Sequence, residues 1–166
     1  MKCPACGHDN LEGIDRCEEC MEPFRDLDVP RPKEGFQASI MLDPVQNILY
    51  PSPATVSSTD SVSSAVELMR QFRAGAVLVV DNGHLSGILS EVDLLFKAGI
   101  ENAGTSHVDQ FMTPNPVCLE EDSSIASALH AMSVGGYRHL PVVHDGKVVG
   151  IVSIKDVLRY LSQQLL

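Results

Sequence analysis

An internal repeat constrains the fold of this chain more than any other feature of its sequence. Comparing the 166 residues with themselves at an offset of 63 aligns Asp93 with Asp156 and needs no gap between residues 62 and 99. The matched positions of the first copy include Ser64, Ala65, Met69, Gly87, Ile88 and Ser90. Each copy has about 60 residues and is too small to bury a sizeable core alone, so we expect the two copies to pack against each other.

Both copies show the same order of hydrophobic patterns. In the first, residues 60–74 have helical spacing, residues 75–90 predict two strands joined by a turn at 81–83, and residues 91–99 resume a helical period. The second copy repeats these elements at 123–134, 139–144, 147–153 and 155–165, and short strands are expected before the copies at 54–56 and 116–119. The predicted fold class is α+β, with two β-α-β-β-α units packed as a pair.

Four of the five cysteines lie in the first 20 residues, as Cys3, Cys6, Cys17 and Cys20. Two C-x2-C elements separated by ten residues can surround one tetrahedral metal ion and leave no coordination position open. A redox dithiol uses the same residues, but a segment this short cannot fold by burial alone, which favours a metal. We expect a structural Zn²⁺ site; iron in a rubredoxin-like electron-transfer site has the same ligands and stays open as an alternative.

Composition divides the chain into four parts. We expect a metal-binding segment at 1–28, a charged linker with prolines at 29–39, and the two repeat units at 40–104 and 105–166. No apolar run approaches the roughly 18 residues of a membrane span, and residues 1–7 lack the apolar core of a secretion signal. The sequence therefore predicts a cytoplasmic protein that does not bind membranes.

Charge argues against nucleic acid as a partner. The formal net charge is −10, and the first 28 residues contain three basic and eight acidic side chains. A polyanion would meet net repulsion at such a surface. We therefore expect the cysteine-containing segment to be structural or to dock a protein partner.

The motif G-I-x-S-x-x-D occurs in both copies, at residues 87–93 and 150–156. Serine at a helix N-cap with an acidic residue three positions later forms a capping box, which explains both residues without a ligand. Alternatively, the aspartate accepts hydrogen bonds from ribose hydroxyls, serine and the helix N-terminus face a phosphate, and glycine lets a base approach the backbone. Both interpretations are open at this point.

Longer segments resemble a known family. The second copy contains FMTPNPVCLEEDSSIASALHAM and YRHLPVVHDGKVVGIVSIKDVL, and the first contains AVLVVDNGHLSGILSEVDLL. These segments resemble the cystathionine-beta-synthase (CBS) domain pair, or Bateman module, over residues 40–165. The CPACG and CEEC segments resemble a zinc ribbon, although Met21 stands where such modules often have glycine.

The CBS resemblance implies a non-enzymatic regulatory protein that binds AMP, ADP, ATP or another adenosyl compound between its two units, and that forms a homodimer. It assigns ligand contacts to Ser90, Asp93, Ser153 and Asp156, and phosphate contacts to Arg138 and His139. The first copy has Gly75 and Ala76 at the last two positions, so phosphate affinity is expected to be asymmetric. The segment before each copy serves the ligand of the other, which brings Thr113 and Val117 to Ser90 and Asp93, and Thr55 to Ser153 and Asp156.

A second hypothesis is an interaction scaffold in which both S-x-x-D segments are only capping boxes. A catalytic function has no candidate residues in the sequence, because there is no nucleophile elbow, Walker loop or open metal site among its motifs.

Overall fold

The computed structural model describes residues 6–10, 16–21, 35–97 and 103–164. The chain divides into two compact units, Met1–Ala38 and Ser39–Leu166. The second unit contains both copies of the repeat and is described first. No helix within the described ranges is long and apolar enough to span a bilayer.

Both repeat copies form the predicted β-α-β-β-α order. The first contains β2 (Thr55–Val56), α2 (Val62–Phe72), β3 (Ala76–Asp81), β4 (His84–Ser90) and α3 (Glu91–Lys97). The second contains β6 (Leu119–Glu120), α4 (Ile125–Gly135), β7 (His139–His144), β8 (Lys147–Ser153) and α5 (Ile154–Gln164). The expected end of the helix at residue 99 lies outside the described residues.

Local signals in the sequence explain where these elements begin and end. The hydroxyls of Ser61 and Ser124 accept hydrogen bonds from N–H groups in the first turns of α2 and α4, at 3.2 and 3.1 Å. The turn between β3 and β4 has φ values of 52° at Asn82 and 81° at Gly83. These left-handed conformations suit asparagine and glycine and match the twist of a two-residue hairpin.

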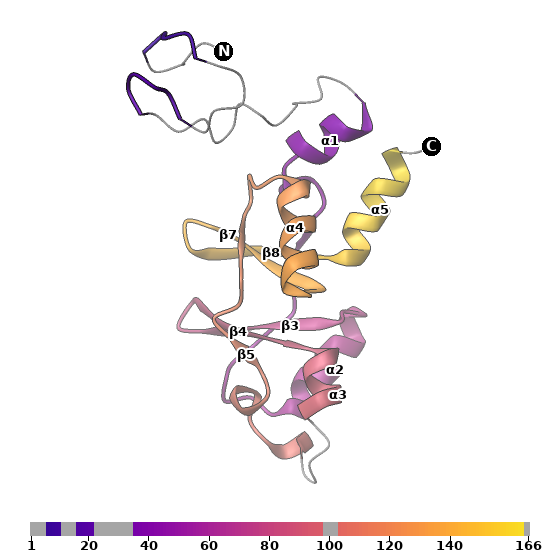
Figure 1. Ribbon diagram of the computed structural model, residues 1–166. Coiled ribbons are helices and arrows are strands. Elements are labelled where there is room, and N and C mark those ends of the chain that lie inside the picture. Colours follow the sequence, from indigo (N-terminus) through magenta and orange to yellow (C-terminus); the bar gives the residue numbers. More distant parts are fainter. Residues whose placement is uncertain (1–5, 11–15, 22–34, 98–102, 165–166) are drawn as a thin grey trace. The chain divides into compact units, whose positions relative to one another are not determined.

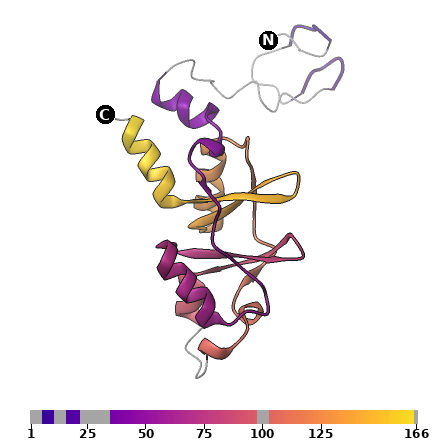
Figure 2. The same cartoon turned by 180° about the vertical axis from the view of Figure 1, so that it is seen from behind.

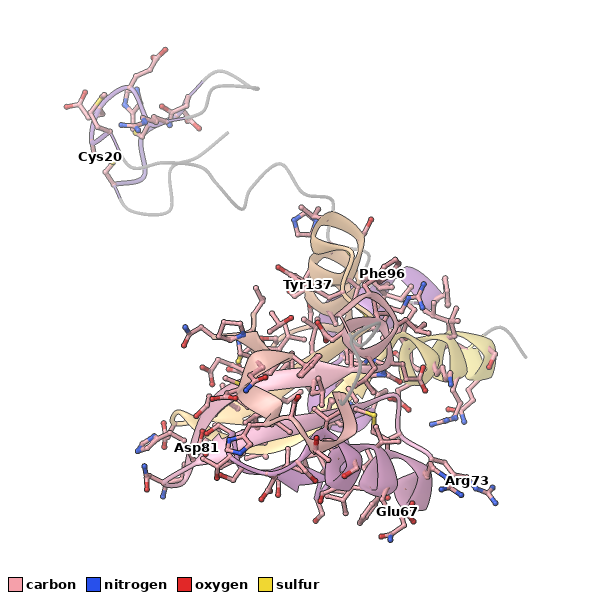
Figure 3. The ribbon with its side chains drawn as sticks, turned by 90° about the horizontal axis from the view of Figure 1, so that it is seen from below. Cys20, Glu67, Arg73, Asp81, Phe96 and Tyr137 are labelled. Carbon is pink, nitrogen blue, oxygen red and sulfur yellow. The ribbon has the colours of Figure 1, made fainter. Side chains whose placement is uncertain are left out.

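The end of the first hairpin is also tied to the segment before α2. The N–H of Ser58 donates to Asp81 Oδ1 at 3.0 Å, and the hydroxyl of Ser57 donates to the same oxygen at 2.9 Å. These hydrogen bonds, of which the one from Ser58 has the largest effect, lower the pKa of Asp81 to about 2. Figure 3 shows Asp81 at one end of the first sheet and Arg73, which ends α2, at the other.

The two copies exchange short edge strands. β1 (Tyr50–Pro51) pairs with β8 of the second copy, and β5 (Thr113–Pro114) pairs with β4 of the first. The sheet orders are therefore β1-β8-β7-β6 and β2-β3-β4-β5, each with one parallel pair. The segment before each copy thus completes the sheet of the other copy.

Figures 1 and 2 show the two sheets stacked between two layers of helices. α4 and α5 cover the outer face of one sheet, and α2 and α3 cover the outer face of the other. The inner faces meet through Ala76, Leu78 and Ile88, packed with Val148 and Ile151 of the second copy. β3 and β7 are therefore buried on both faces, which explains their nearly continuous apolar sequences.

Short 3-10 turns add to the two outer cores. η1 (Val45–Asn47) places Val45 in the core of the second copy, and η3 (Val108–Gln110) places Val108 in the core of the first. A third turn, η2 (Ala103–Thr105), precedes η3. The exchange of segments between copies therefore includes core residues as well as edge strands.

One helix was not expected. α1 (Phe36–Leu42) begins inside residues 29–39, which the sequence analysis interprets as a linker. The chain after this helix is held by the second copy: the Tyr160 hydroxyl donates to Asp43 Oδ2 at 2.5 Å, and the N–H of Ile125 donates to the Asp43 carbonyl at 3.0 Å. The prolines and charged residues just before this helix are typical of a linker, so the sequence did not predict a helix here.

Candidate functional site

A cavity of about 540 Å³ lies between the two copies, within the range of roughly 300–1,000 Å³ typical of small-molecule sites. Its wall includes the β4–α3 junction, β5 with the residues after it, and the loop that leads into β7. Six predicted site residues line it: Ser90, Asp93, Thr113, Val117, Arg138 and His139. Thr55, Ser153 and Asp156 are not among its lining residues.

Both S-x-x-D segments form the capping box that the sequence permits. The N–H and hydroxyl of Ser90 donate to Asp93 Oδ2 at 3.0 and 2.5 Å, and the Asp93 N–H donates to the Ser90 hydroxyl at 3.3 Å. Ser153 and Asp156 repeat this arrangement with nearly the same distances. Capping engages one carboxylate oxygen in each copy, so the difference between the copies lies at the other oxygen.

Asp93 and Asp156 have different partners at Oδ1. Asp93 Oδ1 accepts a hydrogen bond from the Thr113 hydroxyl at 3.2 Å, at the edge of the cavity. Asp156 Oδ1 instead accepts from the guanidinium of Arg159 at 3.0 Å, in an ion pair on the same helix. Only the first motif presents its carboxylate to the cavity described above.

The glycine of each motif has a structural reason that differs from the expected one. A Cβ atom on Gly87 would lie 2.6 Å from Met112 Sδ and 3.0 Å from the Thr113 carbonyl oxygen. A Cβ atom on Gly150 would lie 2.6 Å from Leu49 Cδ1 and 2.9 Å from the Tyr50 carbonyl oxygen. Glycine at these positions therefore admits the exchanged strand, a reason that requires no ligand.

His139 is half-buried beside the cavity, and its pKa is lowered, which favours the neutral ring at pH 7. Burial lowers its pKa, and although the carboxylate of Glu91 opposes this shift, the charge of Lys155 adds to it. Its ring packs against Gly75, where a Cβ atom would lie 2.9 Å away. Arg138 is therefore the charged member of the predicted phosphate-binding pair.

Several lining residues escaped the sequence analysis. Tyr137 lines the cavity, and its ring lies against Gly135, where a side chain would collide with it. Figure 3 labels this side chain. The sequence did contain a signal for Tyr137, because this aromatic residue stands between two glycines and Arg138, which is predicted to contact phosphate. Glu91, inside the first S-x-x-D segment, also lines the cavity.

The backbone of Val117, a lining residue of the cavity, is a further feature that side-chain motifs do not reveal. In the first copy, the N–H of Leu78 donates to the Ala54 carbonyl at 3.0 Å. The repeat places Pro141 and Val117 at the corresponding positions of the second copy. Proline has no N–H, so this hydrogen bond cannot form and the Val117 carbonyl keeps its acceptor capacity.

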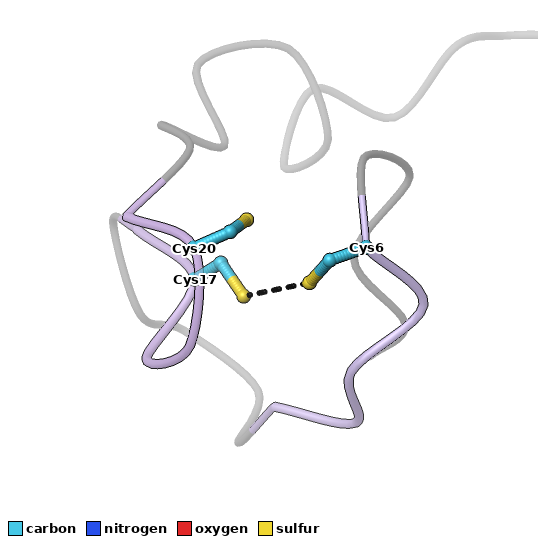
Figure 4. A group of neighbouring side chains, drawn as sticks. All are labelled: Cys6, Cys17 and Cys20. Carbon is cyan, nitrogen blue, oxygen red and sulfur yellow. Dashed lines mark hydrogen bonds between the residues drawn. The ribbon is translucent and has the colours of Figure 1, made fainter.

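The described part of the first unit gathers three of the four predicted metal ligands. The sulfur atoms of Cys6, Cys17 and Cys20 all lie within 4.8 Å of one another, and those of Cys6 and Cys17 are 3.6 Å apart (Figure 4). Zinc–sulfur bonds of about 2.3 Å in a tetrahedron separate two sulfurs by roughly 3.8 Å, so the cluster fits such an ion. Cys3 lies outside the described residues.

Local backbone contacts support this cluster. Burial raises the pKa of the Cys17 thiol, but hydrogen bonds from the backbone of Cys20 and Glu19 outweigh it and lower the pKa to about 6. The buried Asn10 side chain donates to the His8 carbonyl and accepts from the Glu18 N–H, both at 2.9 Å. This amide joins the two cysteine-containing turns.

Met21 follows the second C-x2-C element, at a position where zinc ribbons often have glycine. It has φ of 59°, and Gly7, which follows the other C-x2-C element in the same way, has φ of 75°. The two turns thus share a left-handed residue although one lacks glycine.

Comparisons with known proteins agree on the family. The CBS domain profile matches residues 45–98 and 108–163. An uncharacterized 17.7 kDa protein of Acidianus ambivalens is 32% identical over 123 residues, which cover 73% of this chain and 74% of that protein. The CBS domain-containing protein CBSCBSPB3 of Arabidopsis thaliana is 34% identical over 107 residues, and this match spans about a fifth of that relative's length (19%).

Solved structures show the same fold. The CBS domain pair of protein MJ0100, in complex with 5′-methylthioadenosine and S-adenosyl-L-methionine, has 30% identity and a TM-score of 0.67, covering 74% of this chain and 98% of that one. CBSX2 in complex with AMP has 28% identity and a TM-score of 0.63, covering 72% and 96%. The chain therefore belongs to the CBS domain family and contains a pair of these domains.

Proposed function

We propose that this chain is a non-enzymatic regulatory protein that senses an adenosyl ligand in the cavity beside Ser90 and Asp93. The observation that carries this proposal is the convergence of Asp93, Val117 and Arg138 on one cavity. The complexes of two relatives with adenosyl compounds support the ligand class.

Each part of such a ligand has a chemical counterpart at the cavity. Asp93 Oδ1 would accept from ribose hydroxyls in place of the Thr113 hydroxyl, with charge-assisted hydrogen bonds. The Val117 carbonyl would accept from an adenine amino group, and the Tyr137 ring offers an aromatic surface to the base. Arg138 would pair with a phosphate or carboxylate.

Charge favours ligands with few negative charges. The cavity is lined by two carboxylates, Glu91 and Asp93, and by one permanent cation, Arg138. These side chains sum to −1, so a positively charged adenosyl sulfonium would be balanced, whereas each further phosphate from AMP to ATP adds negative charge that Arg138 alone must neutralise. We therefore expect affinity to fall in the order AMP, ADP, ATP.

A thermal-shift series with AMP, ADP, ATP, S-adenosylmethionine and NAD tests this proposal. At 100 times its dissociation constant a ligand stabilises by about 2.7 kcal/mol, which raises Tm by several degrees. Asp93→Asn should remove the shift, while Asp122→Asn, an exposed surface control, should keep it. If none of these compounds shifts Tm, the capping boxes serve structure alone and the protein is an interaction scaffold.

For the N-terminal unit we propose a zinc ribbon in which Cys3, Cys6, Cys17 and Cys20 hold Zn²⁺ and which docks a protein partner. Four thiolates form a closed site, so the metal would supply folding free energy and leave catalysis without a coordination position. Metal analysis should find one zinc per chain and no visible absorbance. Stoichiometric iron with visible absorbance would support electron transfer instead.

We also propose a homodimer. Leu95 on α3 and Leu158 on α5 occupy equivalent repeat positions and are 79% and 57% exposed. A second copy of the chain presents the same two side chains, so a two-fold interface over both helices is self-complementary. Light scattering after size exclusion should give twice the chain mass, and Leu95→Asp should shift it to the monomer; a monomeric wild type contradicts the proposal.

A further inference from the structure

We infer that the homodimer is head-to-tail: α3 of each chain packs against α5 of its partner, and not against the partner's α3. This inference rests on the proposed dimer and adds the orientation of its two chains. It depends on how the two repeat copies differ in the exposed side chains of these helices.

α3 and α5 hold equivalent places in the two copies. Each begins directly after the last strand of its copy, α3 after β4 and α5 after β8. Figure 1 shows both helices on the same side of the domain pair, one in each outer layer. A two-fold axis can therefore pair like helices, head-to-head, or exchange them, head-to-tail. Either arrangement makes two contacts and closes on itself, so the side chains decide between them.

The side chain beside each exposed leucine differs between the copies. Leu95 is followed by Phe96, which is 84% exposed. Leu158 is followed by Arg159, whose side chain stays 66% exposed although it pairs with Asp156. Pairing of like helices brings two guanidinium groups together, whereas exchange offers each guanidinium an aromatic ring, which attracts cations. The residues next to the leucines therefore favour the head-to-tail dimer.

The two helices also carry opposite net charges. The ionisable residues give −1 for α3, from Glu91, Asp93 and Lys97, and +1 for α5, from Lys155, Asp156 and Arg159. Glu91 and Lys155 are both exposed. Pairing of like helices opposes charges of one sign at both contacts, whereas exchange opposes charges of different sign at both. Because each chain has a net charge of −10, two copies repel each other overall, and local complementarity has to offset this repulsion.

A charge exchange at the two leucines tests the orientation by sedimentation equilibrium of the full-length protein. Leu95→Asp and Leu158→Lys are combined in one chain, the Asp/Lys chain. In a head-to-tail dimer an aspartate then faces a lysine at both contacts, whereas a head-to-head dimer opposes two aspartates at one contact and two lysines at the other. The matched control combines Leu95→Asp with Leu158→Asp, the Asp/Asp chain, and opposes like charges in both orientations.

The dimer of the Asp/Lys chain should have a dissociation constant at least about tenfold lower than that of the Asp/Asp chain, because opposite charges replace like charges at both contacts. Added NaCl should narrow this difference, since salt screens exposed charges. Circular dichroism and Tm show whether both chains are folded, as substitutions at exposed positions should permit.

A milder pair of variants keeps both leucines. Lys155→Glu changes the net charge of α5 from +1 to −1, so it should weaken a head-to-tail dimer about three- to tenfold and leave a head-to-head dimer nearly unchanged. Adding Glu91→Lys to this chain reverses the charge of α3 as well and should restore the head-to-tail dimer. This second change distinguishes a restored charge pair from a general effect of Lys155→Glu on stability.

The outcomes separate this inference from the proposed dimer. A monomeric wild type overturns the dimer and its orientation together. A dimeric wild type whose Asp/Lys and Asp/Asp chains dissociate alike, or both stay dimeric, overturns the head-to-tail orientation alone. Failure of Glu91→Lys to restore the Lys155→Glu chain does the same. None of these results bears on ligand sensing, which the thermal-shift series tests independently.

Discussion

At the scale of single residues, His139 lines the cavity and its pKa depends on the charged groups around it. The groups that act on it come from both copies: Glu91 and Asp156 favour its charged form, and Lys155 and Arg138 oppose it. Burial is the largest effect and keeps the ring neutral. Because this imidazole is neutral, Arg138 is the neighbour that offers positive charge to a ligand. The lowered pKa of His139 also makes the stability of the fold depend on pH.

That response is a testable stability difference. Because the pKa of His139 is lowered in the folded state, the unfolded chain binds more protons as pH falls below the ordinary value of about 6.5, and folding loses free energy there. Urea denaturation at pH 7 and pH 5 should show a larger loss for wild type than for His139→Gln. Equal losses would mean that His139 does not titrate as its burial requires.

Residue-level features also mark the limits of the sequence analysis. The sequence shows that Pro141 has no N–H, but not which carbonyl lies opposite it, and it does not show that Arg159 pairs with Asp156 Oδ1. Tyr137 is uncharged and belongs to neither S-x-x-D segment, so no motif indicated that it lines the cavity. The residues Ser90, Asp93, Thr113 and Val117 were placed together correctly, since the resemblance assigns the segment before one copy to the ligand of the other.

At the scale of elements, the exchanged strands β1 and β5 connect the fold to the site. Each has two residues, one of them proline, so neither produces a periodic pattern in the sequence. The longer elements were predictable because helices and hairpins have local signals in capping serines and Asn-Gly or Asp-Gly turns. Pairing between segments distant in the chain has no such signal.

The glycines that admit these strands give a matched pair of variants. Gly87→Ala should displace Met112 and Thr113. This displacement should lower both the stability and the AMP affinity, because Thr113 lies at the cavity. Gly150→Ala should displace Leu49 and Tyr50 and lower stability by overpacking, by about 1–3 kcal/mol, with AMP affinity kept. Denaturation and calorimetry on both variants check this; equal affinity losses would contradict the assignment of the site to β5.

β7 offers a second test at this scale. Pro141→Ala restores an N–H that can donate to the Val117 carbonyl, as the Leu78 N–H does to Ala54. The new hydrogen bond competes with an adenine amino group, so AMP affinity should fall about three- to tenfold, the effect of one neutral hydrogen bond. Binding of IMP, which lacks the amino group, should not change. A parallel loss for both nucleotides would assign the effect to packing instead.

At the scale of the whole molecule, the repeat produces a four-layer domain pair whose two halves have diverged. Matching hairpins, caps and exchanged strands preserve the shared architecture, while Phe96, Tyr137, Arg138, Pro141 and Arg159 distinguish one side from the other. A ligand would regulate such a protein only through different affinities for its alternative packings.

The central claim is that an adenosyl ligand binds in the cavity at Asp93. A crystal structure of the full chain grown with saturating AMP tests it most directly. The account predicts nucleotide density in one cavity per chain, with ribose at Asp93, the base amino group at the Val117 carbonyl and phosphate at Arg138. Density at Asp156 instead, or an empty cavity in crystals of protein that is saturated in solution, would contradict it.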